Sequence, residues 1–267
     1  LNKIVGSETF NGSLFLLPKD CRLTEFTLEG ISNIQGDFQC KDYSYVKEFV
    51  MPFIRVAGDM TIALNSGSVN TAAEIEFPKL QEIGGTLTLE SNSNANNIAF
   101  PSLKKILGSC SVTTTDLKND IEFTNLESIG TDGADEQIKF EIEATNILCP
   151  KLKTINGKFD IATSSFMFDM EVDKVSYPNV ESISENLSIT CPYSDFGSNG
   201  ILSIDFSGLK SVKGISISGQ GDVTDFSSFK YLFENNVLTG ESQWSVKECG
   251  YNPTFQEMKD GKYKLAE

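Results

Sequence analysis

One pattern of apolar and polar positions recurs along most of this chain. Its clearest copy, residues 74–89, reads EIEFPKLQEIGGTLTL and follows the scheme apolar-x-apolar-Pro-x-Leu-x-x-Ile-x-Gly-x-apolar-x-apolar. About eight similar segments can be aligned on the position of Leu80. These anchors are Ile31, Ile54, Leu80, Leu103, Leu126, Leu152, Val180 and Leu209, separated by 23, 26, 23, 23, 26, 28 and 29 residues. A steady period in the twenties is typical of a solenoid.

The alternation within each copy predicts strands. Runs such as Leu87-Thr88-Leu89 have the two-residue period of a strand with one buried face. No helical pattern recurs between them. We therefore predict a mainly β fold: a right-handed parallel β-solenoid of about eight coils, each with two short strands. Pro before the anchor suits a strand end, and we expect the Gly to supply a corner conformation that side chains disfavour.

The pattern also predicts how the chain is organised. We expect one elongated solenoid domain over residues 1–267, with a cap over 1–22, repeats over 23–220 and a C-terminal helix and cap over 221–267. Phe10, Leu14 and Leu16 predict a first strand or hairpin that covers the open end. Apolar residues at helical spacing after Asp225 predict a short amphipathic capping helix, with Asp225 or Thr224 as its N-cap.

The phrase Leu-x-x-Ile-x-Gly-x-Leu-x-Ile, seen here at Leu80, Ile83, Gly85 and Leu87, resembles the receptor L domain. This leucine-rich module occurs in the ectodomains of insulin and growth-factor receptors. The chain is also similar to leucine-rich surface proteins of fungi and of gut bacteria of the Bacteroides type. The similarity covers about residues 28–217. It implies leucine-rich-repeat architecture and recognition at a cell surface, without the cysteine-rich modules of the animal receptors.

The net charge narrows the choice of partners. With 22 basic and 37 acidic residues, the formal charge is -15, which disfavours nucleic acid and anionic membrane surfaces as partners. No apolar run is long enough to cross a bilayer. Because the chain starts at Leu1, we expect a mature segment whose targeting sequence has been removed. We expect an extracytoplasmic location, either secreted or anchored at the cell surface, for example as a lipoprotein.

The residue types available exclude several kinds of chemistry. The chain has no histidine, which removes Ser-His-Asp triads, Cys-His dyads and His-ligated metals. Cys40, Cys110 and Cys149 occupy apolar positions, where we expect buried thiols. Cys21, Cys191 and Cys249 lie outside the pattern, and a Cys21–Cys40 disulfide stays open. The absence of a CxxC motif argues against zinc.

Two groups of acidic residues are candidate calcium sites. One is a column that precedes the first strand of successive coils, with Glu25, Glu48 and Glu74 among its members. The other is the turn TDGADEQ, with Asp132, Asp135 and Glu136. A solvated face and a plain acidic turn are the favoured interpretations. We therefore expect no cofactor and keep calcium as the alternative.

Aromatic residues in two inserted segments are the better candidates for ligand binding. Phe166, Phe168, Tyr193 and Phe196 fall in neighbouring coils and would lie near each other. The alternative is that these segments fold back over the core. By contrast, the outward positions of the second strands are rich in Ser and Thr and contain no aromatic residue, which does not favour glycan binding there.

The sequence leaves three classes of function. The first is a non-enzymatic recognition or adhesion module that binds a protein through loops on one side of the solenoid, with a glycan as the second choice of ligand. The second is a polysaccharide lyase or hydrolase on a parallel β-helix, using calcium and carboxylates; Lys139 and Lys158 beside Glu141 and Asp160 give it slight support. The third is a structural surface spacer. The lack of histidine and the Ser/Thr-rich face favour binding over catalysis.

The sequence also contains two N-x-S sequons. They are Asn11-Gly12-Ser13 and Asn186-Leu187-Ser188. They are acceptors for N-linked glycans only if the source is eukaryotic.

Overall fold

The computed structural model describes residues 3–17, 25–41, 48–64, 73–91, 95–114, 121–132, 139–143, 147–162, 174–191, 203–221 and 223–266. The fold is mainly β, with parallel strands stacked as a β-solenoid and few helices. The predicted fold class is confirmed at this level. The chain divides into two compact units. Unit 1 comprises Leu1–Thr131 with Asn146–Cys149, and unit 2 comprises Asp132–Thr145 with Pro150–Glu267.

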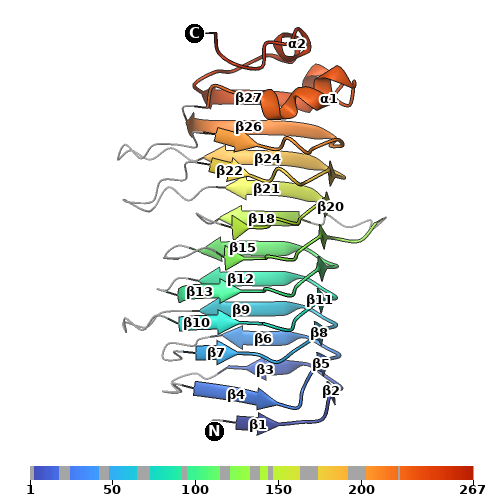
Figure 1. Cartoon of the computed structure of the whole chain (residues 1–267), viewed down its shortest axis with the longest axis vertical. Helices are drawn as coiled ribbons and strands as arrows, with labels where there is room; N and C mark the ends of the chain where they lie inside the picture. The colour runs from blue at the N-terminus through green and yellow to red at the C-terminus, as the bar shows by residue number, and fades with distance from the viewer. Residues whose placement is uncertain are drawn as a thin grey trace. The chain divides into compact units, whose positions relative to one another are not determined.

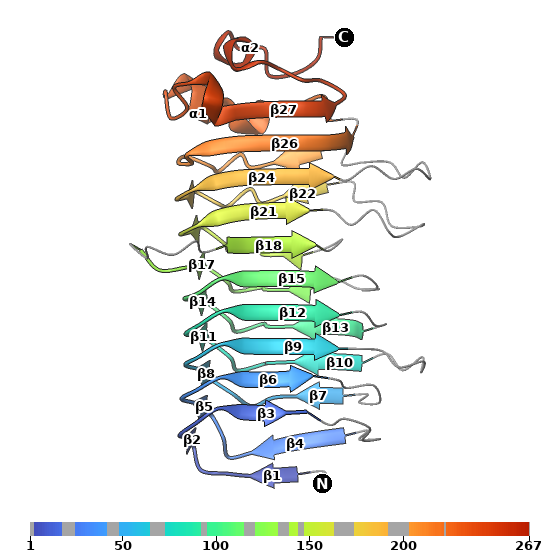
Figure 2. The ribbon, with the colours of Figure 1, turned by 180° about the vertical axis from the view of Figure 1, so that it is seen from behind.

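Three ladders of parallel strands build unit 1, and we name them by their place in Figures 1 and 2. The front sheet contains β1 (Lys3–Val5), β4 (Glu25–Glu29), β7 (Glu48–Val50), β10 (Ala73–Glu76), β13 (Ala95–Ala99), β16 (Ile121–Glu122) and β19 (Ile147–Leu148). The corner sheet contains β2 (Thr9–Phe10), β5 (Asn33–Ile34), β8 (Arg55–Val56), β11 (Glu82–Ile83), β14 (Lys105–Ile106) and β17 (Ser128–Ile129). The back sheet contains β3 (Leu14–Leu16), β6 (Phe38–Lys41), β9 (Met60–Leu64), β12 (Leu87–Ser91) and β15 (Cys110–Thr114).

Unit 2 repeats this arrangement and adds the helices. Its front strands are β22 (Lys174–Ser176) and β25 (Ser203–Asp205), and its corner strands are β20 (Thr154–Ile155) and β23 (Ser182–Ile183). Its back strands are β18 (Lys139–Glu143), β21 (Lys158–Ala162), β24 (Asn186–Cys191), β26 (Gly214–Gly221) and β27 (Trp244–Cys249). The helices are η1 (Ser227–Phe229), α1 (Lys230–Glu234), η2 (Glu241–Gln243) and α2 (Phe255–Lys259).

The core is built from columns of like residues, because strands in neighbouring turns pair in register. In the corner sheet of unit 1, Ile83 pairs with Val56 on one side and with Ile106 on the other, and Ile106 pairs with Ile129. All four side chains are fully buried. The aromatic rings of Phe77, Phe100 and Phe123 stack in the same way, with centroids 5.0 and 5.2 Å apart.

At one turn the sequence pattern assigned the wrong anchor. Ile54 was predicted to point inward, but its side chain is 38% exposed, whereas Phe53 is fully buried. The pairing of Val56 with Ile83 places Phe53, and not Ile54, at the level of Leu80. The physical reason is a shorter corner, since Met51 and Phe53 are separated by Pro52 alone whereas two residues separate Phe77 from Leu80.

The repeated Gly has a different role from the one predicted. In unit 1 the amides of Gly36, Gly58, Gly85 and Gly108 each donate to the carbonyl of the Gly one turn earlier, at 2.9–3.0 Å. None of these four has the positive φ that was expected, although Gly130 does, at 80°. Their constraint is the close approach of adjacent turns. A Cβ on Gly108 would lie 2.6 Å from the carbonyl carbon of Gly85.

We therefore predict that Gly108→Ala lowers the free energy of unfolding by about 1–3 kcal/mol, because the new methyl group overpacks against backbone atoms that have no freedom to rotate away. Gly240→Ala is the matched control. Its Cβ would meet nothing closer than 4.0 Å, so we expect a change within about 0.5 kcal/mol. Urea unfolding followed by circular dichroism measures both. Equal midpoints for the two variants would show that the turns can separate to admit a side chain.

Both terminal segments contain strands that pair with the ladders. Phe10, Leu14 and Leu16 lie in β2 and β3, which pair in parallel with β5 and β6. Of the two alternatives, a first strand or a hairpin, the strand is therefore correct, and the segment forms a turn like those that follow. At the other end, β27 continues the back sheet of unit 2, with Trp244 opposite Ile215. The predicted helix is present as η1 and α1, but its N-cap is Phe226 and not Asp225 or Thr224. The Asp225 carboxylate accepts the Ser227 N–H at 2.7 Å from just outside the helix.

A cluster of aromatic residues closes unit 2 beside β27. Trp244 packs edge-on against Phe229 and Phe233, with ring centroids 5.6 and 5.1 Å apart. Helix α2 begins with a capping box in which Thr254 accepts the Glu257 N–H while the Glu257 carboxylate accepts from Thr254. These bonds from Thr254 hold the pKa of Glu257 below its usual value.

Candidate binding site

The four aromatic residues predicted to bind a ligand, Phe166, Phe168, Tyr193 and Phe196, lie outside the residues that the structure describes. The strands that flank their two segments are described. Residues 163–173 follow β21 and precede β22, and residues 192–202 follow β24 and precede β25.

The two segments leave unit 2 from neighbouring strands and return to neighbouring strands. β21 and β24 pair in parallel, with Ala162 opposite Thr190. β22 and β25 also pair in parallel, with Lys174 opposite Ser203. Paired strands lie about 4.8 Å apart, so the two segments are adjacent at both ends. This is the arrangement expected if their aromatic residues act together.

The ends of these segments are polar. Lys174, at the first residue of β22, lies 3.9 Å from the carboxylate of Asp205 on β25, and both side chains are partly exposed. Thr190 is exposed beside the end of β24. A partly exposed pair of this kind contributes little to stability.

The two acidic groups predicted as calcium sites are only partly described. Asp132 lies exposed in a turn, whereas Asp135 and Glu136 are outside the described residues. The predicted acidic column is correct in its register, since Glu48 pairs with Glu25 on one side and Glu74 on the other. Within the part of the chain that the structure describes, no group of three Asp, Glu or Cys residues is placed to hold a metal ion.

The lysines and carboxylates suggested for a lyase are segregated by type. Lys139 pairs with Lys158, and Glu141 pairs with Asp160, on the adjacent strands β18 and β21. Like residues therefore face like residues, as in the core columns. Nothing in this register favours the polysaccharide-cleaving alternative over the others.

The outward face of the back sheet is polar, as predicted. In unit 1, Thr88 pairs with Thr61 and Ser111 on adjacent strands. In unit 2, Ser188 pairs with Asp160 and Ser216. None of these side chains is buried, and none of the predicted outward positions that the structure describes is occupied by an aromatic residue. A face of this composition offers no apolar centre for a protein partner.

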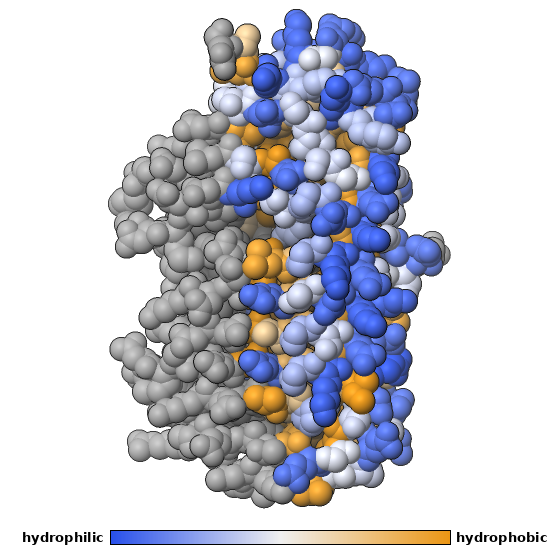
Figure 3. Space-filling view, in the orientation of Figure 1, coloured by the Kyte–Doolittle hydropathy of each residue, from blue (hydrophilic) through white to orange (hydrophobic). Residues whose placement is uncertain are grey.

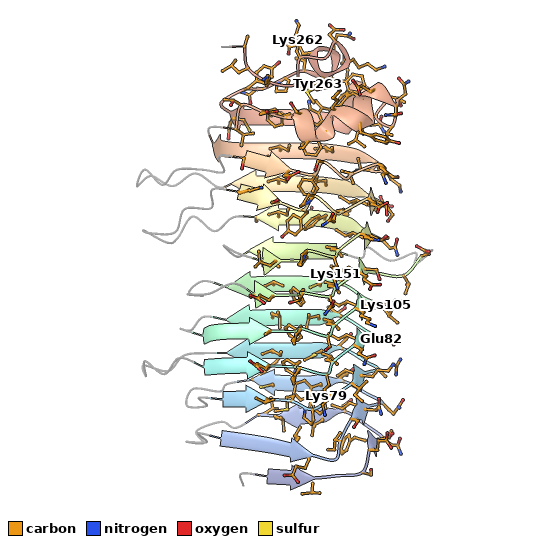
Figure 4. All side chains as sticks on the ribbon, in the orientation of Figure 1. Lys79, Glu82, Lys105, Lys151, Lys262 and Tyr263 are labelled. Atoms are coloured by element: carbon orange, nitrogen blue, oxygen red, sulfur yellow. The ribbon has the colours of Figure 1, made fainter. Side chains whose placement is uncertain are left out.

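Ion pairs between turns lie along the corner sheet, and the sequence analysis missed them. In unit 1 the Arg55 guanidinium donates to Glu82 at 2.8 Å, and Glu82 is in register with Lys105 on the next strand. Figure 4 places Glu82 and Lys105 on the outer side of these strands. In unit 2, Lys210 pairs with Glu181 at 3.1 Å, which lowers the pKa of Glu181 through hydrogen bonding and charge. Figure 3 shows hydrophilic side chains along this side.

Side chains also bond to the backbone of adjacent turns. In unit 1, the N–H of Asp59 donates to the Asp37 carboxylate at 2.9 Å, and the N–H of Thr86 donates to the Asp59 carboxylate at 2.7 Å. Ser102 donates to the Pro78 carbonyl at 2.6 Å. These polar groups and the ion pairs connect turn to turn, so we interpret the corner side as structural.

The three cysteines in the core are chemically unreactive because they are buried. Cys40, Cys110 and Cys149 are buried, as predicted. Burial raises the pKa of the Cys110 thiol well above its ordinary value. Burial, together with the nearby Cys110, also raises the pKa of Cys149. A buried thiol that stays protonated is a poor nucleophile. Cys21 lies outside the described residues, so the Cys21–Cys40 pairing is not placed.

The described residues define a β-solenoid with a polar sheet face and ion pairs at its corner. None of its described helices is long and apolar enough to cross a bilayer. Comparison of the chain with protein-family models, with curated proteins and with solved structures found no match.

Proposed function

We propose that this chain is a non-enzymatic recognition or adhesion module of the receptor L-domain or leucine-rich-repeat type, with about eight coils, that acts outside the cytoplasm in a secreted or surface-anchored protein. Its ligand is a protein, or less favourably a glycan. The binding surface consists of the two adjacent segments 163–173 and 192–202, through Phe166, Phe168, Tyr193 and Phe196.

The observation that supports this proposal is the double pairing of β21 with β24 and of β22 with β25. A solenoid presents its insertions in columns because its strands are in register. We infer from this that the two consecutive insertions, which both carry aromatic residues, contribute to one binding surface. Aromatic anchors dominate the free energy of most protein interfaces.

Competing surfaces are less suited to a ligand. The corner sheet engages its charges in ion pairs between turns. The described outward face of the back sheet holds small hydroxyl side chains and charged groups. The absence of histidine removes the commonest general base, which supports binding over catalysis.

A binding experiment tests the proposal. The intact chain is applied to immobilised extracellular matrix proteins and to a glycan array, beside a variant with Ala at Phe166, Phe168, Tyr193 and Phe196. Loss of anchor residues costs about 2 kcal/mol or more, which corresponds to at least a 25-fold weaker Kd. We expect the variant to lose the ligand while retaining the circular dichroism spectrum of the parent.

The matched control carries Ala at Phe15 and Tyr231, which are exposed aromatic residues on β3 and α1, with 55% and 43% exposure. This variant should bind like the parent. If both variants bind equally well, the site is not on the two segments. If the parent binds neither proteins nor glycans while it cleaves a polysaccharide, the recognition function is wrong and the enzymatic alternative replaces it.

A further inference from the structure

The asparagines of the two N-x-S sequons differ from several other described asparagines in the state of their amide groups. Asn179, Asn235 and Asn252 donate their side-chain amides to backbone carbonyls at 2.8–2.9 Å. Asn11 and Asn186 are exposed, and within the described residues neither side chain makes a hydrogen bond. Their Nδ2 atoms are therefore open to solvent.

We propose that Asn11 and Asn186 carry N-linked glycans. This inference rests on the extracytoplasmic location proposed above and adds to it a eukaryotic secretory route. The donor is a lipid-linked oligosaccharide diphosphate. The Asn Nδ2 forms a bond to C1 of the first sugar, the bond from C1 to the diphosphate oxygen breaks, the diphosphate leaves with the electron pair, and the amide gives up one proton.

The fold leaves room for a glycan on Asn186. This residue is the first of β24 and lies opposite Gly214 on β26. A Cβ at Gly214 would come within 3.1 Å of the Asn186 Oδ1, so the missing side chain provides the space in which the amide lies. Ser188, two residues along the strand, is on the same outward face.

Asn11 is equally accommodated at a tight corner of unit 1. The Gly12 N–H donates to the Phe10 carbonyl at 3.0 Å, which places Asn11 at the tip of a three-residue turn. The Ser13 hydroxyl accepts the N–H of Asp37 at 2.9 Å. In the folded chain the Ser13 hydroxyl is therefore engaged in a hydrogen bond, whereas no bond within the described residues uses the Asn11 side-chain amide.

The pairing of β24 requires that the glycan be transferred to Asn186 before this strand is paired. Leu187, the middle residue of the second sequon, is fully buried, and β24 is paired on both sides, with β21 and with β26. A transferase that binds an extended peptide has no access to this strand once the unit is folded. Modification must therefore precede the pairing of β24.

A glycan on Asn186 is compatible with the proposed binding surface. β24 runs from Asn186 to Cys191, and the segment with Tyr193 and Phe196 follows Cys191. Five residues of extended strand separate the two positions by roughly 16 Å. The glycan would cover the Ser/Thr-rich start of this strand, which is a further reason to place protein recognition at its other end.

Cell-free translation in the presence of endoplasmic-reticulum microsomes tests the proposal, with the full chain behind a cleavable signal sequence. We expect the wild-type chain to carry two glycans that an N-glycosidase removes. The Asn11→Gln and Asn186→Gln variants should each carry one glycan, and the double variant should carry none. Ser188→Ala, which keeps the Asn, must match Asn186→Gln. Asn125→Gln is the control outside a sequon, and it keeps both glycans. A wild-type chain with no glycan overturns the proposal, and an unchanged Asn186→Gln pattern overturns it at that residue.

A second measurement tests accommodation and timing. The secreted, glycosylated chain and the same chain after enzymatic removal of the glycans should differ in Tm by less than about 2 °C. A larger loss in the glycosylated form would contradict the geometry at Gly214. Folded protein made in bacteria should accept no glycan at Asn186 from the purified transferase, whereas the unfolded chain should. The ligand-binding experiment uses that unglycosylated protein, so failure of either proposal leaves the other intact.

Discussion

Trp244→Ala is expected to lower the free energy of unfolding of unit 2 by about 3–5 kcal/mol. The indole is 5% exposed and contacts Phe226, Phe229 and Phe233, with ring centroids 5.1–6.1 Å apart. Its Nε1–H donates to the Pro253 carbonyl at 2.9 Å in a buried setting. Truncation therefore leaves a cavity and also an unpaired carbonyl, and both penalties add to the lost apolar burial.

The effect should extend beyond the cap, because β27 covers one side of β26. A solenoid gains stability from contacts between neighbouring turns, so the loss of a terminal turn exposes the next one. Hydrogen exchange in β26 should become faster together with exchange in β27. Circular dichroism in urea is the appropriate probe of stability, since Trp244 is the one tryptophan of the chain and the variant has no indole fluorescence.

Two variants separate the contributions of Trp244. Trp244→Phe keeps an aromatic ring but loses the hydrogen bond, so we expect it to cost about 1–3 kcal/mol. Tyr231→Ala removes a 43% exposed ring from α1 and should cost less than about 1 kcal/mol. A Trp244→Ala protein as stable as Tyr231→Ala would mean that the aromatic cluster does not hold the end of the unit.

The period of the apolar pattern was sufficient to predict the parallel stacked fold. Ile83, Ile106 and Ile129 recur 23 residues apart because in-register pairing needs the same residue type at the same level of each turn. The corner after Met51 is one residue shorter than the corner after Phe77. Counting from Pro52 therefore assigned the anchor to Ile54 instead of Phe53. Pattern reasoning assumes a constant corner length, and only the pairing of Val56 with Ile83 reveals the deletion.

The partners of strands at the ends of the pattern were harder to predict. The apolar positions of Trp244 and Val246 indicate a strand, but helical residues separate this segment from β26. Nothing local shows that the chain returns to the same ladder. The same limit applies to β3, whose partner β6 begins 24 residues after it.

The polar contacts between turns could have been found once the period was known. Arg55, Glu82 and Lys105 occupy equivalent positions in successive turns and alternate in sign. Aligning charges on the apolar register would have predicted the Arg55–Glu82 ion pair. For the candidate binding site, the register predicts that the two aromatic-bearing segments follow neighbouring strands, and β21 does pair with β24. The conformation of an inserted segment depends on contacts that no repeat specifies.

Leu126→Ala is expected to lower the free energy of unfolding of unit 1 by about 2–5 kcal/mol. Leu126 is fully buried at the anchor position, and its N–H closes a turn by donating to the Phe123 carbonyl at 3.2 Å. The same column holds Leu103, which is also fully buried. Since neighbouring turns hold this side chain in place, the void left by truncation can collapse only partly, and the cost should exceed simple loss of apolar area.

Leu148→Ala provides the matched control because it deletes the same atoms from a side chain in the same unit that is 46% exposed. Leu148 faces outward on β19, in register with Glu122, so we expect a loss below about 1 kcal/mol. Urea midpoints and slopes from circular dichroism compare the two variants. A loss under about 0.5 kcal/mol for Leu126→Ala would contradict the register, whereas a loss several times that of Leu148→Ala supports stability through inward columns that neighbouring turns share.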